Sequence, residues 1–562
     1  MSQSAGDWKL QASIQQKKLA KTVKVERAGK GAVQNYGRRR RPVSERLSLE
    51  AARAELRSHR RQNTGAPSAP LPESHTFSQP SSSFNASSWV SSGVAPPLAG
   101  RNAAGLGEGY LGRPITPKHT ALIMPGQGSQ YVTMAKDLYE SFASARKTWH
   151  AAEAALASLH KNTSTSNVLS TTPRDVFEKT LEESAARAES EFGAPSSDPH
   201  WLRKLVFGGE QLILTQPENA MPAILVTSLA FFNVLRDELG AERMPSLFHM
   251  TAGHGQGVYA ALVATGRISL ADAVRLMRIR GFEAKRCVEQ HPRLFPPGCE
   301  RPASVYETWG FTNAGSGKGG HLVLDDATLA GSKGPRWKGT QVSAIVVRSG
   351  SLQAAMDEVS IVMRDIQRGS VPGIARDEFV AVSSVNSHLQ IVLSGTRVGV
   401  NYACDRLMFK RLGARAVNLP IGGPFHTSLV DSASEAYGRV IDVLPMEMSD
   451  GTPVVSSVHG RLLSSVEDVR AELRDGLNLP VNWLESIQTL LEQGVQRFVC
   501  LGPGRTIAQQ LSKELAFRER HASTSQTELS AYMNEQSDYE VWSVSTAEGV
   551  QQLVQALRPL PR

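Results

Sequence analysis

The sequence predicts an α/β fold with a smaller α+β unit inserted in it, and three observations lead to that prediction. Short apolar segments typical of buried strands alternate with helical patterns from about residue 120 to residue 557. Within this region, residues 341–415 show the order strand, helix, strand, strand, helix, which indicates a compact inserted unit. The third observation is a glycine-framed turn at 253–257, between a strand pattern and a helix pattern.

The chain divides into a basic arm, residues 1–118, and a folded region, residues 119–557. At 562 residues the chain is long enough to bury a sizeable core. Residues 1–70 hold 16 Lys and Arg against 5 Asp and Glu, so the arm accounts for the net charge of +9. Residues 62–110 are rich in Ser, Pro, Gly and Ala, a composition that cannot bury enough apolar surface to offset the entropy of ordering. We therefore expect a mostly disordered arm with one helix at 43–61.

The charge of the arm is compatible with three interpretations: nucleic-acid binding, a solvated or targeting segment, and a nuclear-type basic signal. The run Arg38–Arg41 is a suitable electrostatic footprint for phosphates, as in nucleic-acid binding. A solvated or targeting segment is the simpler interpretation and the one we favour, so nucleic acid is not the expected partner. Richness in Lys, Arg and Ser with few acids is typical of mitochondrial transit peptides. We expect a mitochondrial location, with the cytoplasm as the alternative, and a nuclear-type basic signal remains a third interpretation.

Composition disfavours several other classes of protein. A hydrophobic content of 41% and a charged content of 20% fit a globular chain. The sequence contains no apolar run of about 18 or more residues, so we expect no transmembrane helix. The four cysteines lack metal-ligand spacing, so we expect neither a metal site nor a disulfide framework. Residues Gly315–Gly320 resemble a phosphate loop, but Gly319 stands where a Ser or Thr would hold Mg²⁺. We interpret that segment as a flexible loop, within a loop insertion at 296–340.

The turn at 253–257 has the frame of a nucleophile elbow, G-x-S-x-G, with Gly255 in place of the serine. The apolar run 247–251 precedes it and the helical pattern 258–263 follows it. That context is the one in which an elbow presents its nucleophile at the edge of a sheet. Because glycine has no side chain to acylate, this position decides whether the protein is an enzyme.

Three further residues gain meaning beside this turn. Gln127, in the glycine-rich turn 126–130, offers an amide donor after the first predicted strand. Arg280 stands before a glycine at the end of a helical pattern, where it is either a surface helix cap favoured by the helix dipole or a guanidinium clamp for a carboxylate. His426, taken alone, is most simply an ordinary turn or core histidine. Beside an elbow, it becomes a candidate general base.

Together these segments resemble malonyl-CoA:acyl-carrier-protein transacylases and, more broadly, the acyltransferase domains of fatty-acid and polyketide synthases. The resemblance extends from about residue 119 to residue 557. In order along the chain, its landmarks are GQGSQ at 126–130, ENAMPA at 218–223, GHGQG at 253–257, RIRG at 278–281, VNS at 385–387, PFH at 424–426 and LGPG at 501–504.

The resemblance implies an α/β-hydrolase-like large subdomain with a ferredoxin-like small subdomain inserted at about 341–415. It implies transfer of a malonyl group from malonyl-CoA to the phosphopantetheine thiol of acyl carrier protein, through an acyl-serine and without a cofactor or metal. Malonyl-CoA and acyl carrier protein are therefore the expected partners. The roles that the resemblance implies are general base for His426, oxyanion hole for the backbone N–H groups of Gln127 and Gln256, and substrate binding for Arg280, Phe425 and Asn386.

Three positions depart from the pattern of that family. Gly255 replaces the serine, Val258 stands where Glu is usual, and Met221 stands where many members have Gln. Two hypotheses follow: an active acyl-carrier-protein S-malonyltransferase, or a catalytically inactive homologue that binds acyl carrier protein or coenzyme A as a scaffold or regulator. We favour the second hypothesis, because loss of the nucleophile lowers the rate of a serine hydrolase by a factor of roughly 10⁶. Glycine also adopts the strained conformation of an elbow freely, so it would stabilise the fold while it removes the chemistry.

Overall fold

The computed structural model describes residues 107–108, 114–115, 118–159, 172–193, 198–298, 338–448, 451–523 and 539–558. These residues belong to one compact unit, Asn85–Arg562. The arm with its predicted helix at 43–61, and the Gly315–Gly320 loop, lie outside the described residues, as does most of the predicted loop insertion. The predictions about them stay predictions.

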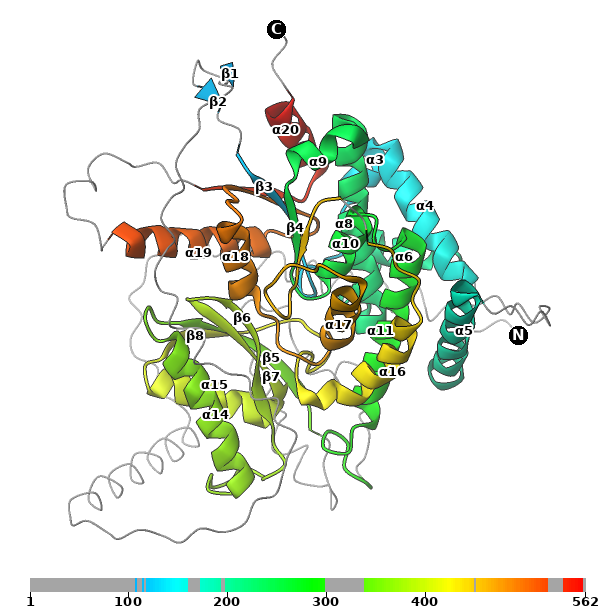
Figure 1. Cartoon of the computed structure of the whole chain (residues 1–562). Coiled ribbons are helices and arrows are strands. Elements are labelled where there is room, and N and C mark those ends of the chain that lie inside the picture. Colours follow the sequence, from blue (N-terminus) through cyan, green and yellow to red (C-terminus); the bar gives the residue numbers. More distant parts are fainter. Residues whose placement is uncertain are drawn as a thin grey trace, which may run out of the picture. The chain divides into compact units, whose positions relative to one another are not determined.

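A five-stranded parallel sheet forms the centre of the large subdomain, with the strand order β11-β10-β3-β4-β9 (Figure 1). Every residue of β3 and β4 is buried, as expected for parallel strands that are covered on both faces. The bounds are β3 Thr120–Met124, β4 Met250–Gly253, β9 Val454–Val455, β10 Arg497–Leu501 and β11 Glu540–Val544, while the short strands β1 Gly107–Glu108 and β2 Pro114–Ile115 pair with each other.

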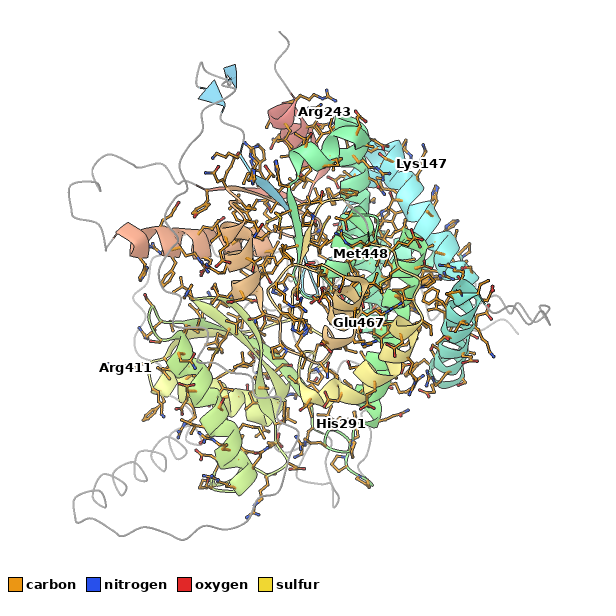
Figure 2. The ribbon with its side chains drawn as sticks, viewed as in Figure 1. Lys147, Arg243, His291, Arg411, Met448 and Glu467 are labelled. Atoms are coloured by element: carbon orange, nitrogen blue, oxygen red, sulfur yellow. The ribbon has the colours of Figure 1, made fainter. Side chains whose placement is uncertain are left out.

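Helices cover both faces of this sheet because successive residues of β3 point to opposite sides. Leu122 and Met124 pack in the core formed with α8, α10 and α11, whereas Ala121 and Ile123 pack in the core formed with α18 and α19. Side chains fill the space between the sheet and these helices (Figure 2). The helices of the large subdomain are α3 Lys136–Ser141, α4 Ala143–Ser158, α5 Pro173–Phe192, α6 Trp201–Gly208, α7 Gln211–Leu214, α8 Pro217–Leu239, α9 Met244–Leu247, α10 Gly257–Ala264, α11 Leu270–Gln290, α16 Asp431–Asp442, α17 Val466–Asp475, α18 Trp483–Glu492, α19 Thr506–Ser523 and α20 Ala547–Leu557.

Helix α8 is the central helix of the large subdomain. By length and composition it could cross a membrane, but 94% of its apolar window is buried inside the fold, as in the core helix of a globular protein. It packs along α11 with unusual closeness, because a Cβ at Gly281 would lie 2.4 Å from the Cα of Glu218. The glycine after Arg280 therefore serves helix packing and does not end the helix.

The small subdomain is a four-stranded antiparallel sheet with two helices on one face. Its order β6-β7-β5-β8, with one helix after β5 and the other after β7, is the ferredoxin-like arrangement that the resemblance implied. The bounds are β5 Thr340–Val347, α14 Leu352–Arg368, β6 Val380–Ser387, β7 Gln390–Thr396, α15 Arg397–Phe409 and β8 Gly413–Asn418. A bridge between Ser384 and Val481 joins β6 to the segment before α18.

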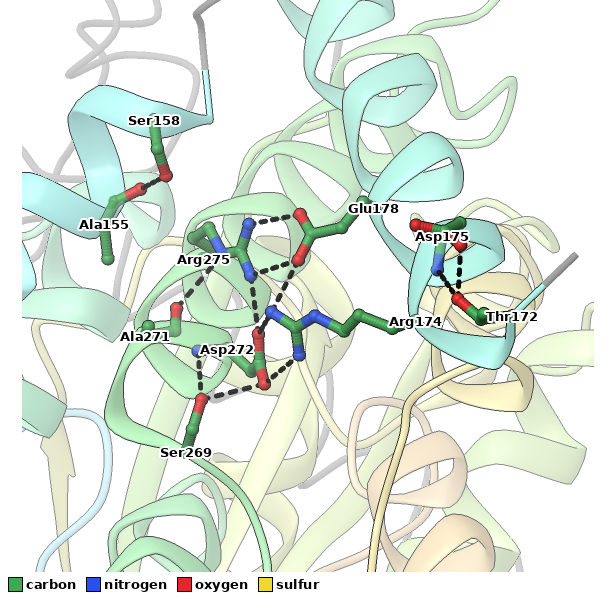
Figure 3. A network of polar contacts seen from close by, with 10 residues as sticks. All are labelled: Ala155, Ser158, Thr172, Arg174, Asp175, Glu178, Ser269, Ala271, Asp272 and Arg275. Carbon is green, nitrogen blue, oxygen red and sulfur yellow. Dashed lines mark hydrogen bonds and ion pairs between the residues drawn. The ribbon is translucent and has the colours of Figure 1, made fainter. Parts of the chain in front are cut away.

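A charged network fixes helix α5 to α11 (Figure 3). Asp272 accepts hydrogen bonds from Arg275 at 2.6 Å and from Arg174 at 2.7 Å. Arg275 also donates to both carboxylate oxygens of Glu178, at 2.6 and 3.0 Å. Since Asp272 and Arg275 are buried, this network holds α5 in one position on the core.

Candidate active site

The turn between β4 and α10 has the backbone of a nucleophile elbow. Gly255 has φ of 54°, the left-handed conformation that glycine adopts without strain. The flanking glycines permit close backbone contact, since a Cβ at Gly253 would lie 2.1 Å from the backbone nitrogen of Val258 and one at Gly257 would lie 2.4 Å from the carbonyl oxygen of Met124. The chain thus keeps the geometry of the elbow although the nucleophile is absent.

His426 faces the position of the missing side chain. A Cβ built on Gly255 would lie 3.7 Å from Nε2 of His426 and 3.6 Å from Cγ2 of Val481, which is ordinary van der Waals contact. Nδ1 of His426 lies 3.1 Å from the carbonyl oxygen of Leu479. Because a carbonyl only accepts, Nδ1 carries the proton and Nε2 presents its lone pair toward the elbow. This is the tautomer that a general base requires.

Burial keeps the imidazole of His426 neutral. Burial is the largest cause, and together with the nearby positive charge of Arg280 it lowers the pKa of His426 to about 3. The backbone of His426 also lies in the left-handed region, with φ of 59°, and its N–H donates to the carbonyl of Leu477 at 2.9 Å. Backbone strain of this kind is concentrated at functional sites.

Arg280 is a buried cation without a carboxylate partner among the residues that the structure describes. Its side chain lies inside the protein, with the residue only 2% exposed. Nη2 donates to the carbonyl of Gly476 at 2.6 Å, and Nη1 lies 3.5 Å from Sδ of Met221. Nε has no acceptor in the described part of the chain. A buried guanidinium costs free energy unless an anion compensates it, so this position suits an acidic ligand.

The surface-cap alternative for Arg280 is wrong. Helix α11 continues through Gly281 to Gln290, which places Arg280 in the middle of the helix and on its buried face.

The two glutamines predicted for the oxyanion hole lie in turns that touch each other. A Cβ at Gly126 would lie 2.2 Å from the carbonyl oxygen of His254, so the turns holding Gln127 and Gln256 are in direct contact. Among the described residues, neither the backbone N–H of Gln127 nor that of Gln256 has a hydrogen-bond acceptor. Both amide side chains also have buried atoms without partners. Unpaired donors beside the elbow are what an oxyanion needs.

Asn386 and Phe425, which were predicted to bind substrate, make contacts within the protein itself. Asn386 accepts a hydrogen bond from Nε2 of His254 at 2.8 Å and donates to Gln390 at 2.9 Å. Phe425 is buried in the core of the large subdomain next to the general base candidate. Substrate binding by Asn386 and Phe425 stays a prediction. The contact that the structure describes is the hydrogen bond from His254 to Asn386, which helps to position the elbow.

Sequence reasoning missed three groups that hold the site together. The N–H of Gly255 donates to Oγ of Ser457 at 2.7 Å, and the N–H of Ser457 donates to the buried carboxylate of Glu472 at 2.8 Å. The carbonyl of Leu479 fixes the tautomer of His426. A backbone carbonyl carries no sequence signal, and Ser457 belongs to no motif, so only the fold could place them.

The other departures from the family pattern are also buried. Val258 is 2% exposed in the first turn of α10, and Met221 is fully buried on α8. Met221 therefore presents a thioether to Arg280 where an amide would offer a stronger acceptor. Within the described residues, no group of three or more His, Cys, Asp and Glu side chains is placed to hold a metal ion.

Comparison with known proteins gives the class first. The fold is the α/β acyl transferase fold: a solved malonyl-transacylase in complex with a type II PKS acyl-carrier protein matches with a TM-score of 0.51 and 20% identity, over 78% of this chain and 99% of that one. The malonyl CoA-acyl carrier protein transacylase of Coxiella burnetii matches with a TM-score of 0.52 and 20% identity, over 78% and 98%. Residues 121–291 match the acyl transferase domain family.

Sequence similarity narrows the class. The malonyl CoA-acyl carrier protein transacylase of Bacillus subtilis (strain 168) is 27% identical over 389 residues, which are 69% of this chain and 88% of that protein. The corresponding protein of Staphylococcus aureus (strain MRSA252) is 25% identical over 396 residues, 70% and 92% of the two chains. By sequence, the chain is similar to malonyl CoA-acyl carrier protein transacylases.

Proposed function

We propose that this chain binds malonyl thioesters in the cleft of an acyl transferase but does not form an acyl-enzyme, and that it acts as a binding homologue in fatty-acid biosynthesis. The observation that carries the proposal is that His426 has the tautomer and position of a general base, whereas Gly255, at the nucleophile position, has no side chain. Nε2 of His426 faces Gly255 at a distance that would suit a serine, yet the backbone offers nothing to acylate.

Arg280 supports malonyl recognition within this proposal. Its guanidinium is buried, has an unpaired Nε, and has no carboxylate partner among the described residues. The free carboxylate of a malonyl group offers the charge that would compensate it, through charge-assisted hydrogen bonds. An acetyl group has no such carboxylate and would bind more weakly. Acyl carrier protein and coenzyme A are the two carriers of the malonyl group that the similar enzymes act on.

The retained base keeps one alternative open, which is turnover by the chain as it stands. The neutral imidazole of His426 could accept the proton from the phosphopantetheine thiol of acyl carrier protein, and the thiolate sulfur would then attack the malonyl-CoA carbonyl directly. In that step a new C–S bond forms as the bond to coenzyme A breaks, and the proton passes to the leaving thiolate. Gly255 takes no part in such a transfer.

Two measurements on the full chain separate these functions. Calorimetric titration with malonyl-CoA and acetyl-CoA should show malonyl-CoA bound more tightly, by about tenfold or more. Incubation with malonyl-CoA and holo-acyl carrier protein should give no malonyl-carrier protein above the rate without protein. Transfer at an enzymatic rate would establish the alternative, and equal binding of both thioesters would contradict the role of Arg280.

For the basic arm we propose a targeting function toward mitochondria, supported by its Lys-, Arg- and Ser-rich composition alone. Fusion of residues 1–118 to a fluorescent protein tests it, with an Arg38–Arg41→Gln variant as the control. Mitochondrial fluorescence that the variant reduces would support the proposal, and a diffuse cytoplasmic or nuclear signal would contradict it.

A further inference from the structure

A second cavity lies away from the candidate active site. Its volume is about 1090 Å³, and it is bounded by the start of α5, the second half of α8, the turn after α10 and the loop after α16. None of the residues assigned to the active site lines it. This volume is slightly above the range of about 300–1,000 Å³ that is typical of small-molecule pockets.

Three arginines, Arg236, Arg267 and Arg470, line this cavity. Arg267 is only 5% exposed, and its Nη1 donates to the carbonyl of Thr452 at 3.1 Å. Its Nε is buried and has no acceptor among the described residues, where Arg267 also forms no ion pair with a carboxylate. Burial without a compensating charge lowers the pKa of Arg267. The guanidinium of Arg267 therefore has donor capacity left for an anionic group such as a carboxylate.

The acidic side chains of the wall do not compensate these arginines. Asp272 is held by Arg174 and Arg275, and Asp442 accepts from Arg474. Glu447 is the third acid of the wall, and it is exposed. Among the described residues, none of these three acids forms an ion pair with Arg267.

Arg236 and Arg470 are the two other arginines of the wall. Arg236 is exposed at the end of α8 and forms no ion pair within the described part of the chain. Arg470 lies 3.9 Å from the carboxylate of Glu467, donates to the carbonyl of Leu444 at 3.4 Å, and leaves its Nε without an acceptor.

Much of the rest of the wall is apolar, beside the polar Asn233 and Ser269. It presents an aliphatic and aromatic surface to the same cavity, contributed by Leu229, Phe232, Val263, Leu270, Leu444 and Met446. A ligand that satisfies both surfaces has one anionic group and an apolar body.

We propose that this cavity is a binding site for an amphipathic carboxylate, with its carboxylate on Arg267 and its hydrocarbon chain along the apolar wall. The site goes beyond the proposed function, because it neither shares residues with the cleft at Gly255 nor requires malonyl recognition. Its ligand class is a fatty acid or a similar chain-bearing acid.

Calorimetric titration of the full chain with dodecanoate, and with dodecanol as the uncharged analogue, tests this proposal. We expect dodecanoate to bind at one site and dodecanol to bind at least about tenfold more weakly, because only the acid satisfies Arg267. Arg267→Met, which keeps the length and apolar stem of the side chain, should weaken dodecanoate binding by about tenfold or more. Arg348→Met removes an exposed arginine outside the cavity and should leave binding unchanged.

Two further variants keep the test decisive if Arg267→Met does not fold. Arg236→Met changes an exposed residue of the wall, and Met446→Trp fills the apolar part of the cavity. Both should weaken dodecanoate binding. Equal binding of dodecanoate and dodecanol, unchanged binding in all the cavity variants, or displacement of dodecanoate by malonyl-CoA would overturn the proposal, the last because it would place the probe in the other cleft.

Discussion

The imidazole of His426 and the backbone of Gly255 lie in the relationship of a general base to the position of its nucleophile. A Cβ on Gly255 would lie 3.7 Å from Nε2 of His426. Apart from atoms of the two adjacent residues, the nearest heavy atom to this Cβ would be Cγ2 of Val481 at 3.6 Å. The space for a serine is therefore present. The unfavourable factor for a serine is the left-handed backbone conformation at this position, with φ of 54°.

This relationship predicts the effect of side chains at 255 on stability. Gly255→Ser and Gly255→Ala should each lower the free energy of unfolding by about 1–3 kcal/mol, since only the backbone conformation is unfavourable for them. Thermal unfolding followed by circular dichroism checks the change. Alanine is the matched control, because it adds the Cβ without the hydroxyl. Variants as stable as the natural chain would show that glycine does not stabilise the elbow.

Removal of the charge of Arg280 should separate binding from folding. Arg280→Met is expected to weaken malonyl-CoA binding by about ten- to a hundredfold, because a charge-assisted pair is lost. The same change should leave thermal stability equal or higher, since a buried guanidinium without an acidic partner costs free energy to desolvate. Titration with malonyl-CoA and a melting curve provide both values. A strong loss of stability with unchanged affinity would indicate a structural role.

Burial of His426 predicts a pH dependence of stability. Its pKa of about 3 in the folded state is below the ordinary value of 6.5, so below pH 6.5 the unfolded chain binds the proton that the folded chain does not. The contribution is thus present in full above pH 6.5 and is lost as the pH falls toward 3. At pH 5 the loss should be about 2 kcal/mol.

Urea unfolding at pH 7 and pH 5 measures this effect, with His426→Gln as the comparison. The natural chain should lose more stability between the two pH values than the variant does. His254 is also buried and has a lowered pKa, but it is present in both proteins and cancels in the difference. Equal losses would show that His426 is accessible to protons in the folded state.

The network between α5 and α11 predicts a large effect of one carboxylate. Asp272→Ala should destabilise the protein by about 3–5 kcal/mol, because the buried guanidinium of Arg275 loses a partner at 2.6 Å. Glu467→Ala removes one end of an exposed ion pair with Arg474 and should change stability by less than about 1 kcal/mol. Denaturant unfolding of the two variants compares these values. Similar effects would mean that the network does not fix α5.

The sequence predicted those elements whose own pattern is strong. The first strand, predicted between about residue 120 and the turn at 126–130, is confirmed as β3, Thr120–Met124. Its continuous apolar run suits a strand buried on both faces. The strand before the elbow was expected at 247–251 but is β4, Met250–Gly253, while Met244–Leu247 is a short helix. Short apolar runs do not distinguish a strand from a helical turn, and Pro245 at the start of that helix is a signal in favour of the turn.

Strand β8, Gly413–Asn418, was not predicted. It is an edge strand, and all but its first residue are exposed, so its sequence has no apolar alternation to detect. At the site, the pairing of Gly255 with His426 followed from a resemblance to known enzymes. The contacts through Ser457 and the carbonyl of Leu479 depend on tertiary packing and could not be read from residue types.

The central claim is that the cleft is complete except for the nucleophile, and covalent labelling of Gly255→Ser tests it most directly. The variant, the natural chain and Gly255→Ala are incubated with malonyl-CoA, and intact-protein mass spectrometry measures the fraction carrying a malonyl group. We predict labelling of the serine variant alone, at residue 255. An unlabelled serine variant that binds malonyl-CoA would contradict the claim that base and oxyanion donors are in place, and labelling of the natural chain would contradict the claim that Gly255 removes the acyl-enzyme.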